Sequence, residues 1–121
     1  MKTARQITLD LLIRMDTSGA YSNIILDHAF SSQEANRRDK AFAAALFYGV
    51  LERRMTLDYL IRFYSEIEFD KISIPVTEIL RMGFYQLLYM NSVPDSAAVN
   101  ESVLLCDYCD SGRAKGFVNA V

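Results

Sequence analysis

Hydrophobic residues recur three or four positions apart along most of this chain, a spacing that gathers them on one face of an α-helix. The first such run stops before Gly19, a residue type that commonly ends helices. Its members are Ala4, Ile7, Leu11, Leu12 and Met15. No segment shows the alternation of apolar and polar residues expected of a strand. The sequence therefore predicts an all-α fold, a compact helical bundle.

Turn signals divide the chain into about seven predicted helices. The first begins near residue 4 and stops before 19, and the next four cover about 24–30, 37–54, 57–64 and 75–90. The sixth follows its cap at 95 or 96 and runs to about 108, and the last begins at the break at 112. Pro75 suits the first turn of the fifth helix, and Asp95 or Ser96 can cap the sixth. The segment "AFAAALFYGVL" (41–51) is apolar on all sides, whereas a surface helix keeps one polar face. We therefore expect the third helix to be central and buried on most sides.

Two glycines, Gly49 and Gly83, fall inside predicted helices, where each costs about 1 kcal/mol relative to alanine. A helix keeps glycine most readily where a neighbouring backbone comes close. The alternative is a glycine tolerated on the surface. We favour close helix crossings at both positions.

Composition places the chain among ordinary globular proteins, with 121 residues, 51% of them apolar and 23% charged. That length suits one domain, residues 1–121. The net charge of -2 argues against a strongly basic nucleic-acid coat but allows a local basic patch. The sequence shows no signal peptide and no uninterrupted apolar run long enough for a membrane span. We expect a cytoplasmic location and no membrane contact.

Residues that could carry catalysis or hold a metal are scarce. No glycine-rich nucleotide-binding loop and no nucleophile motif is present. Cys106 and Cys109 form a C-x-x-C motif, but structural zinc sites use four ligands and His28 is the only histidine. Because the motif follows a helical pattern, we interpret Cys106 as a core residue and Cys109 as half-exposed. His28 is expected at the surface. The sequence therefore predicts no catalytic residue and no metal site in this chain.

Polar residues also interrupt the later apolar helices, at Arg81, Asn100, Glu101 and Asn119. Such residues often mark active sites, yet no nucleophile or base accompanies them. We interpret Arg81, Asn100 and Glu101 as an internal ion pair or capping network between the fifth and sixth helices, and give Asn119 the same status.

Five strings in fixed order carry a resemblance that covers nearly the whole chain. They are "GAYSN" (19–23), "FYGVLERR" with "LD" (47–58), "ILRMGFYQLLYM" (79–90), "VPDSAAVNESV" (93–103) and "GFVNAV" (116–121). Together they resemble the NusB-like domain, a helical RNA-binding fold. The first and last strings, with "LRMGFYQLLYM", are most similar to its form at the front of RsmB-type (Sun/Fmu family) ribosomal RNA cytosine-C5 methyltransferases.

This resemblance implies that the chain is a fragment lacking a C-terminal methyltransferase domain. That domain would bind S-adenosylmethionine and carry the catalytic cysteines, so no cofactor is expected in this chain. The implied partners are ribosomal RNA and the catalytic domain. A second reading is a stand-alone NusB-type transcription antitermination factor, which joins RNA to proteins.

The resemblance also directs attention to basic residues. Lys2 and Arg5 occupy the segment matching an arginine-rich RNA-binding stretch of the antitermination factor. The second basic group is "RRDK", with Arg37, Arg38 and Lys40 at the start of the third helix, where free N–H groups also attract phosphate. The alternative for this group is a solvated charge run. We take these five residues as the candidate RNA-binding set.

A third pair of basic residues, Arg53 and Arg54, follows the third predicted helix. These arginines could extend the patch or pair with Glu52 or Asp58.

Overall fold

The computed structural model describes residues 2–18 and 36–121. These contain six α-helices and two short 3-10 helices, and no strand occurs within them. The α-helices are α1 (Ala4–Ser18), α3 (Arg37–Glu52), α4 (Arg54–Tyr64), α5 (Ile74–Tyr89), α6 (Asp95–Tyr108) and α7 (Lys115–Ala120); the 3-10 helices are η1 (Phe69–Lys71) and η2 (Gly112–Ala114). The all-α prediction is confirmed. The helix expected at 24–30, the "GAYSN" string and His28 lie outside the described residues.

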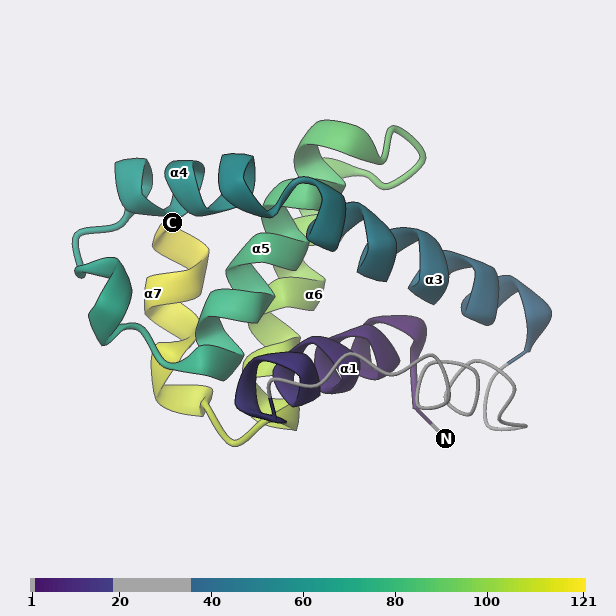
Figure 1. The fold of residues 1–121 in the computed structure, drawn as a ribbon, viewed down its shortest axis with the longest axis horizontal. Coiled ribbons are helices and arrows are strands. Elements are labelled where there is room, and N and C mark those ends of the chain that lie inside the picture. The colour runs from purple at the N-terminus through teal and green to yellow at the C-terminus, as the bar shows by residue number, and fades with distance from the viewer. Residues whose placement is uncertain (1, 19–35) are drawn as a thin grey trace.

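Helix α5 forms the centre of the bundle and contacts α1, α3, α4, α6 and α7 (Figure 1). Its buried side chains include Ile79 and Met82, both fully enclosed. The prediction that the third helix would be central is wrong. Helix α3 buries Leu46 and Phe47 but leaves Tyr48 45% exposed. One face of the helix therefore lies in solvent. The small alanines of the helix keep the apolar area exposed on that face low.

Local sequence signals account for the helix starts. The Oγ of Ser73 accepts a hydrogen bond from the N–H of Val76 at 3.4 Å, and Pro75 occupies the first turn of α5. Helix α6 starts directly after Pro94 at Asp95, without a side-chain cap, so the predicted cap by Asp95 or Ser96 is wrong. None of the helices among the described residues is long and apolar enough to cross a bilayer.

Both glycines lie at helix–helix contacts, as predicted. Gly49 on α3 faces the phenol ring of Tyr85 on α5, and an added methyl group would overlap that ring. Gly83 on α5 faces Ser102 on α6, whose Oγ would lie 2.9 Å from an added Cβ. Each glycine therefore admits a neighbour's side chain, rather than the neighbour's backbone, into the space that a Cβ would fill.

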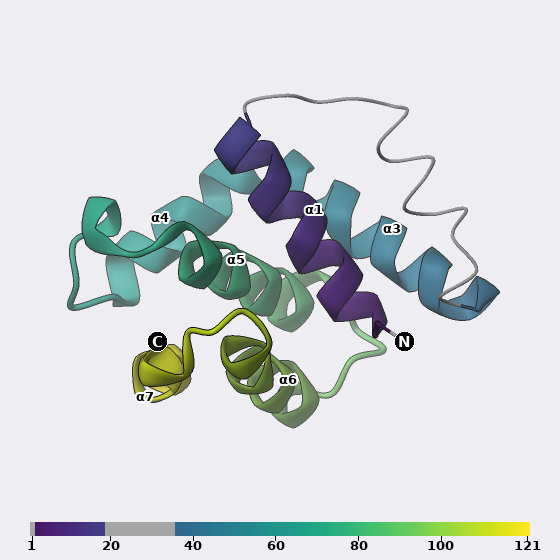
Figure 2. The ribbon, with the colours of Figure 1, turned by 90° about the horizontal axis from the view of Figure 1, so that it is seen from below.

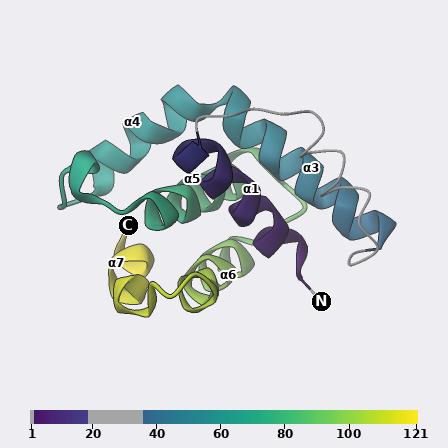
Figure 3. The ribbon, with the colours of Figure 1, turned by 60° about the horizontal axis from the view of Figure 1, so that its bottom comes forward.

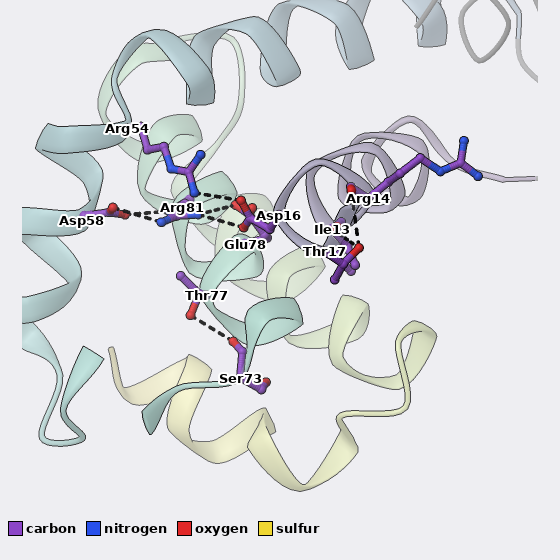
Figure 4. Close-up of polar contacts among 10 residues, drawn as sticks. All are labelled: Ile13, Arg14, Asp16, Thr17, Arg54, Asp58, Ser73, Thr77, Glu78 and Arg81. Carbon is purple, nitrogen blue, oxygen red and sulfur yellow. Dashed lines mark hydrogen bonds and ion pairs between the residues drawn. The ribbon is translucent and has the colours of Figure 1, made fainter. Parts of the chain in front are cut away.

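A buried ionic network ties α1, α4 and α5 together (Figure 4). At its centre is Arg81, 4% exposed, which bonds Asp58 on α4, Asp16 on α1 and Glu78 one turn earlier on α5. Arg54 joins from the start of α4 through a 2.8 Å ion pair with Asp16.

These contacts correct one prediction and rule out one of the alternatives left open for Arg54. Arg81 does not pair with Asn100 or Glu101, so its network joins α5 to α1 and α4 instead of α6. Arg54 selects Asp16, which is 38 residues away in sequence, over Glu52 and Asp58. Asn119 is exposed on α7.

Candidate nucleic-acid interface

The N-terminal ends of α1 and α3 lie at the same end of the molecule, and Val121 lies at the other (Figures 2 and 3). An open depression lies between the two N-terminal ends and reaches the loop before α6. It is lined by Lys2, Thr3, Ala4, Arg5, Asn36, Arg38, Asp39, Phe42 and Ser92. Three of the five candidate residues, Lys2, Arg5 and Arg38, therefore share one concave surface. We call it the basic depression.

Arg5 is the most firmly positioned cation of the basic depression. Its Nε donates a 2.8 Å hydrogen bond to Oε1 of Gln86 on α5, and its guanidinium carbon lies 5.0 Å from the ring centroid of Phe42. Gln86 is itself buried and fixed, because its Nε2 donates to the carbonyl of Met82 at 3.0 Å. Partial burial lowers the pKa of Arg5 below its usual value, while Glu101 opposes this effect. Arginine remains charged at neutral pH under these conditions.

Thr8 explains why Arg5 and Phe42 meet. This residue is fully buried where α1 crosses α3, and its hydroxyl lies 3.0 Å from the carbonyl of Ala4 and 3.2 Å from that of Ala43. A small side chain that bonds the facing backbone lets the two helices pack closely. The crossing then sets the first turn of α1 beside the first turns of α3.

Lys2 is held by a carboxylate at the edge of the basic depression. Its Nζ lies 2.9 Å from Oδ2 of Asp10, which also accepts a 2.7 Å hydrogen bond from the hydroxyl of Tyr108. The hydrogen bond and charge of Asp10 raise the pKa of Lys2. Because this pair is solvent-exposed, it is worth at most about 1 kcal/mol, and a phosphate can compete for the lysine.

The start of α3 presents its basic residues on two faces. Asn36 caps the helix by accepting the N–H of Asp39 at 2.8 Å. Arg38 lies one turn before Phe42, so both face the basic depression. Arg37 and Lys40 are three apart and share the adjacent face, outside the lining of the depression. The structure gives these three cations no ion pair within the described residues.

Sequence reasoning missed Phe42, Gln86 and Ser92. Phe42 belongs to an apolar run that reads as core, and Gln86 lies 81 residues from Arg5 in sequence. A possible signal was the polar Gln86 inside the otherwise apolar string "FYQLLYM", which implies a buried hydrogen-bonding role.

The two cysteines are part of the packing. Cys106 is fully buried in the core, and its thiol lies 3.8 Å from the carbonyl of Ser102. Burial raises the pKa of Cys106, which makes its thiolate less available. Cys109 is half-buried, as predicted. Among the residues that the structure describes, no three histidine, cysteine or acidic side chains are grouped as metal ligands.

The fold places the chain in the class of small all-α domains. The particular family is given by sequence. The chain belongs to the NusB family, whose sequence model matches residues 2–121.

Relatives of two kinds share this domain. The chain is 30% identical over 119 residues to a probable ribosomal RNA small subunit methyltransferase B of Bacillus subtilis, covering 98% of this chain and 26% of that protein. It is also 30% identical over 121 residues to the transcription antitermination protein NusB of Bacillus licheniformis, covering 99% of this chain and 91% of that protein. The chain thus spans about a quarter of the length of the methyltransferase.

The fold is also found in a solved structure. A chain in a crystal structure of a plectonemic RNA supercoil superposes with a TM-score of 0.84, at 19% sequence identity, covering 96% of this chain and 86% of that one. At this identity the similarity establishes the helical fold and nothing more.

Proposed function

We propose that this chain is the N-terminal RNA-binding domain of a small-subunit ribosomal RNA (cytosine-5-)-methyltransferase. In this role it positions ribosomal RNA for a catalytic domain that follows it. The observation that carries the proposal is the match of 98% of this chain to 26% of a ribosomal RNA methyltransferase. A chain that matches about a quarter of that protein's length corresponds to one part of the enzyme. The family and the basic depression support RNA as its ligand.

The geometry suggests how RNA would be held. Lys2, Arg5 and Arg38 converge on one concave surface, where their charges attract the phosphate backbone. Arg37 and Lys40 extend this positive charge onto the neighbouring face of α3. Phe42 adds an aromatic ring on which an unstacked base can lie.

Phosphate contacts position a protein without reading sequence. We therefore assign this domain the recognition of RNA shape, and the choice of nucleotide to the catalytic domain. S-adenosylmethionine belongs to that second domain, since this chain has no glycine-rich nucleotide-binding loop. The chain is then one NusB-like domain of a cytoplasmic enzyme and catalyses nothing by itself.

The test combines RNA binding with the native reading frame. Fluorescence anisotropy with a labelled small-subunit ribosomal RNA hairpin should show saturable binding by the 121-residue chain. Isothermal titration with S-adenosylmethionine should show no heat of binding. The reading frame should continue for several hundred residues beyond Val121. Micromolar cofactor binding by the chain alone would contradict the proposal.

A second candidate function is a stand-alone transcription antitermination factor that joins RNA to proteins. It is favoured by the 91% coverage of the Bacillus licheniformis NusB protein. The same reading frame decides between the two, because a stop codon soon after Val121 supports the antitermination factor.

A further inference from the structure

Helix α4 carries three exposed aromatic side chains: Tyr59 and Phe63 lie on the side away from its buried residues, and Tyr64 lies one turn after Ile61, on the side that faces α5. Its inner face buries Leu57 and Ile61 completely. Tyr59, Phe63 and Tyr64 are 64%, 67% and 56% exposed. Exposed apolar side chains that form a contiguous patch mark interaction sites, whereas single exposed apolar residues are normal on a protein surface.

These rings form a connected row. The centroids of Tyr59 and Phe63 are 6.3 Å apart, those of Phe63 and Tyr64 are 5.0 Å apart, and Tyr64 stacks on Phe84 of α5 at 6.1 Å. We call Tyr59, Phe63, Tyr64 and Phe84 the aromatic row. Ring contacts of this kind hold the side chains in place, so less conformational freedom is lost when a partner covers them.

The aromatic row leads into an apolar groove at the C-terminal end of the chain. The groove has a volume of about 90 Å³ and lies between α5, α6 and α7. Phe84 and Leu87 line it from α5, and Val99, Val118 and Val121 are among the other apolar residues of its lining. Phe84 belongs to both features, so a polypeptide leaving Val121 would start beside the groove, whose residue Phe84 also stacks on Tyr64 of the aromatic row.

Charge and position disfavour RNA as the occupant of this surface. The segment after α4 exposes Glu66, Glu68 and Asp70, which outnumber the nearby cations Lys71, 3.9 Å from Glu68, and Arg62, which lies over the Phe69 ring. These carboxylates repel phosphates. The surface also lies at the Val121 end of the molecule, away from the joint N-termini that form the basic depression (Figures 1 and 3).

We propose that the aromatic row and the apolar groove together dock the methyltransferase domain of the same polypeptide. The inference rests on the proposed function, which supplies that domain. A tethered domain has an effective concentration in the millimolar range when its linker is short, so a modest apolar patch is enough to hold it. Docking at this end leaves the basic depression open to RNA, and the two domains would then share one RNA between them.

Hydroxyl-radical footprinting of the full native polypeptide tests the docking, with the 121-residue chain as reference. In the reference, Tyr59, Phe63 and Tyr64 should be oxidised readily. In the full polypeptide their oxidation should fall severalfold. Leu104 is the matched control, because it is 57% exposed on α6 outside both features and should be oxidised equally in both proteins.

A double substitution gives a second measurement. Tyr59→Ser with Phe63→Ser should leave the circular dichroism of the 121-residue chain unchanged, because both side chains are exposed. In the full polypeptide it should speed tryptic cleavage between the domains severalfold. Leu104→Ser should not change that rate.

Each remaining outcome overturns the docking. Equal oxidation of the row in both proteins means that no domain covers it. Protection that grows with the concentration of the 121-residue chain identifies a second copy as the occupant. Protection that follows addition of the RNA hairpin to that chain identifies a nucleic-acid surface. A reading frame without a methyltransferase domain would contradict both the proposed function and the docking. If the methyltransferase domain is present but the rings of the aromatic row are oxidised as readily as in the 121-residue chain, only the docking is contradicted.

Discussion

Arg81 donates two parallel hydrogen bonds to Asp58, from Nε to Oδ1 at 2.6 Å and from Nη2 to Oδ2 at 3.0 Å. The arginine is 4% exposed and the aspartate side chain 16%, so the pair connects α5 to α4 almost out of contact with water. Burial alone would lower the pKa of Arg81, but bonds and charges from Asp58 and Glu78 outweigh it and raise that pKa. Arg81 is therefore charged in the folded protein.

Replacing Arg81 by methionine should destabilise the protein strongly. The substitution leaves Asp16, Asp58 and Glu78 without their shared cation, and breaking a buried ion pair typically costs about 3–5 kcal/mol. Urea denaturation followed by circular dichroism measures this. Arg113→Met is the control, because Arg113 is exposed on η2 and should change stability by less than about 0.5 kcal/mol. A loss below about 1 kcal/mol for Arg81→Met would show that the network adds little to stability.

Glu78 should make stability fall as pH rises towards 8. Burial, followed by a hydrogen bond with Asp16, raises the pKa of Glu78 from 4.5 to about 8, although Arg81 opposes the shift. Between these two values the folded protein keeps a proton that the unfolded chain releases. The folded state is therefore progressively disfavoured from about pH 4.5 to about pH 8, with a slope that approaches about 1.4 kcal/mol per pH unit.

Glu78→Gln isolates this contribution, since glutamine stays neutral and keeps a similar shape. The difference in unfolding free energy between the variant and the parent should grow in the variant's favour from pH 5 to pH 8. Contributions from other titrating groups cancel in that difference. Equal pH slopes for the two proteins would mean that Glu78 is ionised in the folded state.

Gly49 should not accept a methyl group without cost. The added Cβ would overlap the ring of Tyr85, and such overpacking typically costs about 1–3 kcal/mol. This exceeds or cancels the gain of about 1 kcal/mol that alanine brings to a helix interior. Gly116→Ala on α7 is the matched control, because no atom lies within 4 Å of its added Cβ. Thermal melting should show Gly49→Ala below the parent and Gly116→Ala equal to it or above.

Local sequence signals predicted most of the fold. Apolar spacing of three and four predicted the helices, and Pro75 marked the start of α5 correctly. Gly112 instead begins a 3-10 turn, and the α-helix starts at Lys115. The error over the central helix has a physical cause. The apolar composition of a helix shows how much of its surface can be buried. Whether other helices surround it on all sides depends on the tertiary packing of the whole chain. Helix α5 occupies the centre even though it contains the ionisable residues Glu78 and Arg81.

The candidate site was less predictable than the fold. Its cations were visible in sequence, but the hydrogen bond that orients Arg5 joins residues 81 positions apart. The same limit applies to Arg81, whose partner Asp16 lies 65 positions away. Spacing rules describe neighbours on one helix, so they do not identify which helices will cross. The sequence therefore predicts partners for Arg81 on α6, whereas the structure places them on α1, α4 and α5.

Gln86 should affect RNA binding through Arg5 without altering the charge of the surface. Gln86→Leu removes the 2.8 Å hydrogen bond that orients the guanidinium but leaves its charge in place. The dissociation constant for the RNA hairpin should rise severalfold while the salt dependence stays unchanged. Anisotropy titrations at several salt concentrations separate the two quantities. An unchanged dissociation constant would mean that the orientation of Arg5 does not matter for binding.

The basic set itself should produce weak, salt-sensitive RNA binding. Lys2, Arg5, Arg37, Arg38 and Lys40 can neutralise at most about five phosphates, which gives a log–log salt slope of about -3 to -4 on single strands. The net charge of -2 opposes the approach of RNA at long range, so we expect a dissociation constant of about micromolar or weaker at physiological salt. Changing Arg5, Arg37 and Arg38 together to alanine should flatten the slope by about two units, because three of the five charges are lost. Circular dichroism should show unchanged helicity, since two of the three are exposed and Arg5 is only half-buried. If the triple variant keeps the parent's affinity and slope, RNA binds elsewhere and the "RRDK" segment is a solvated helix start.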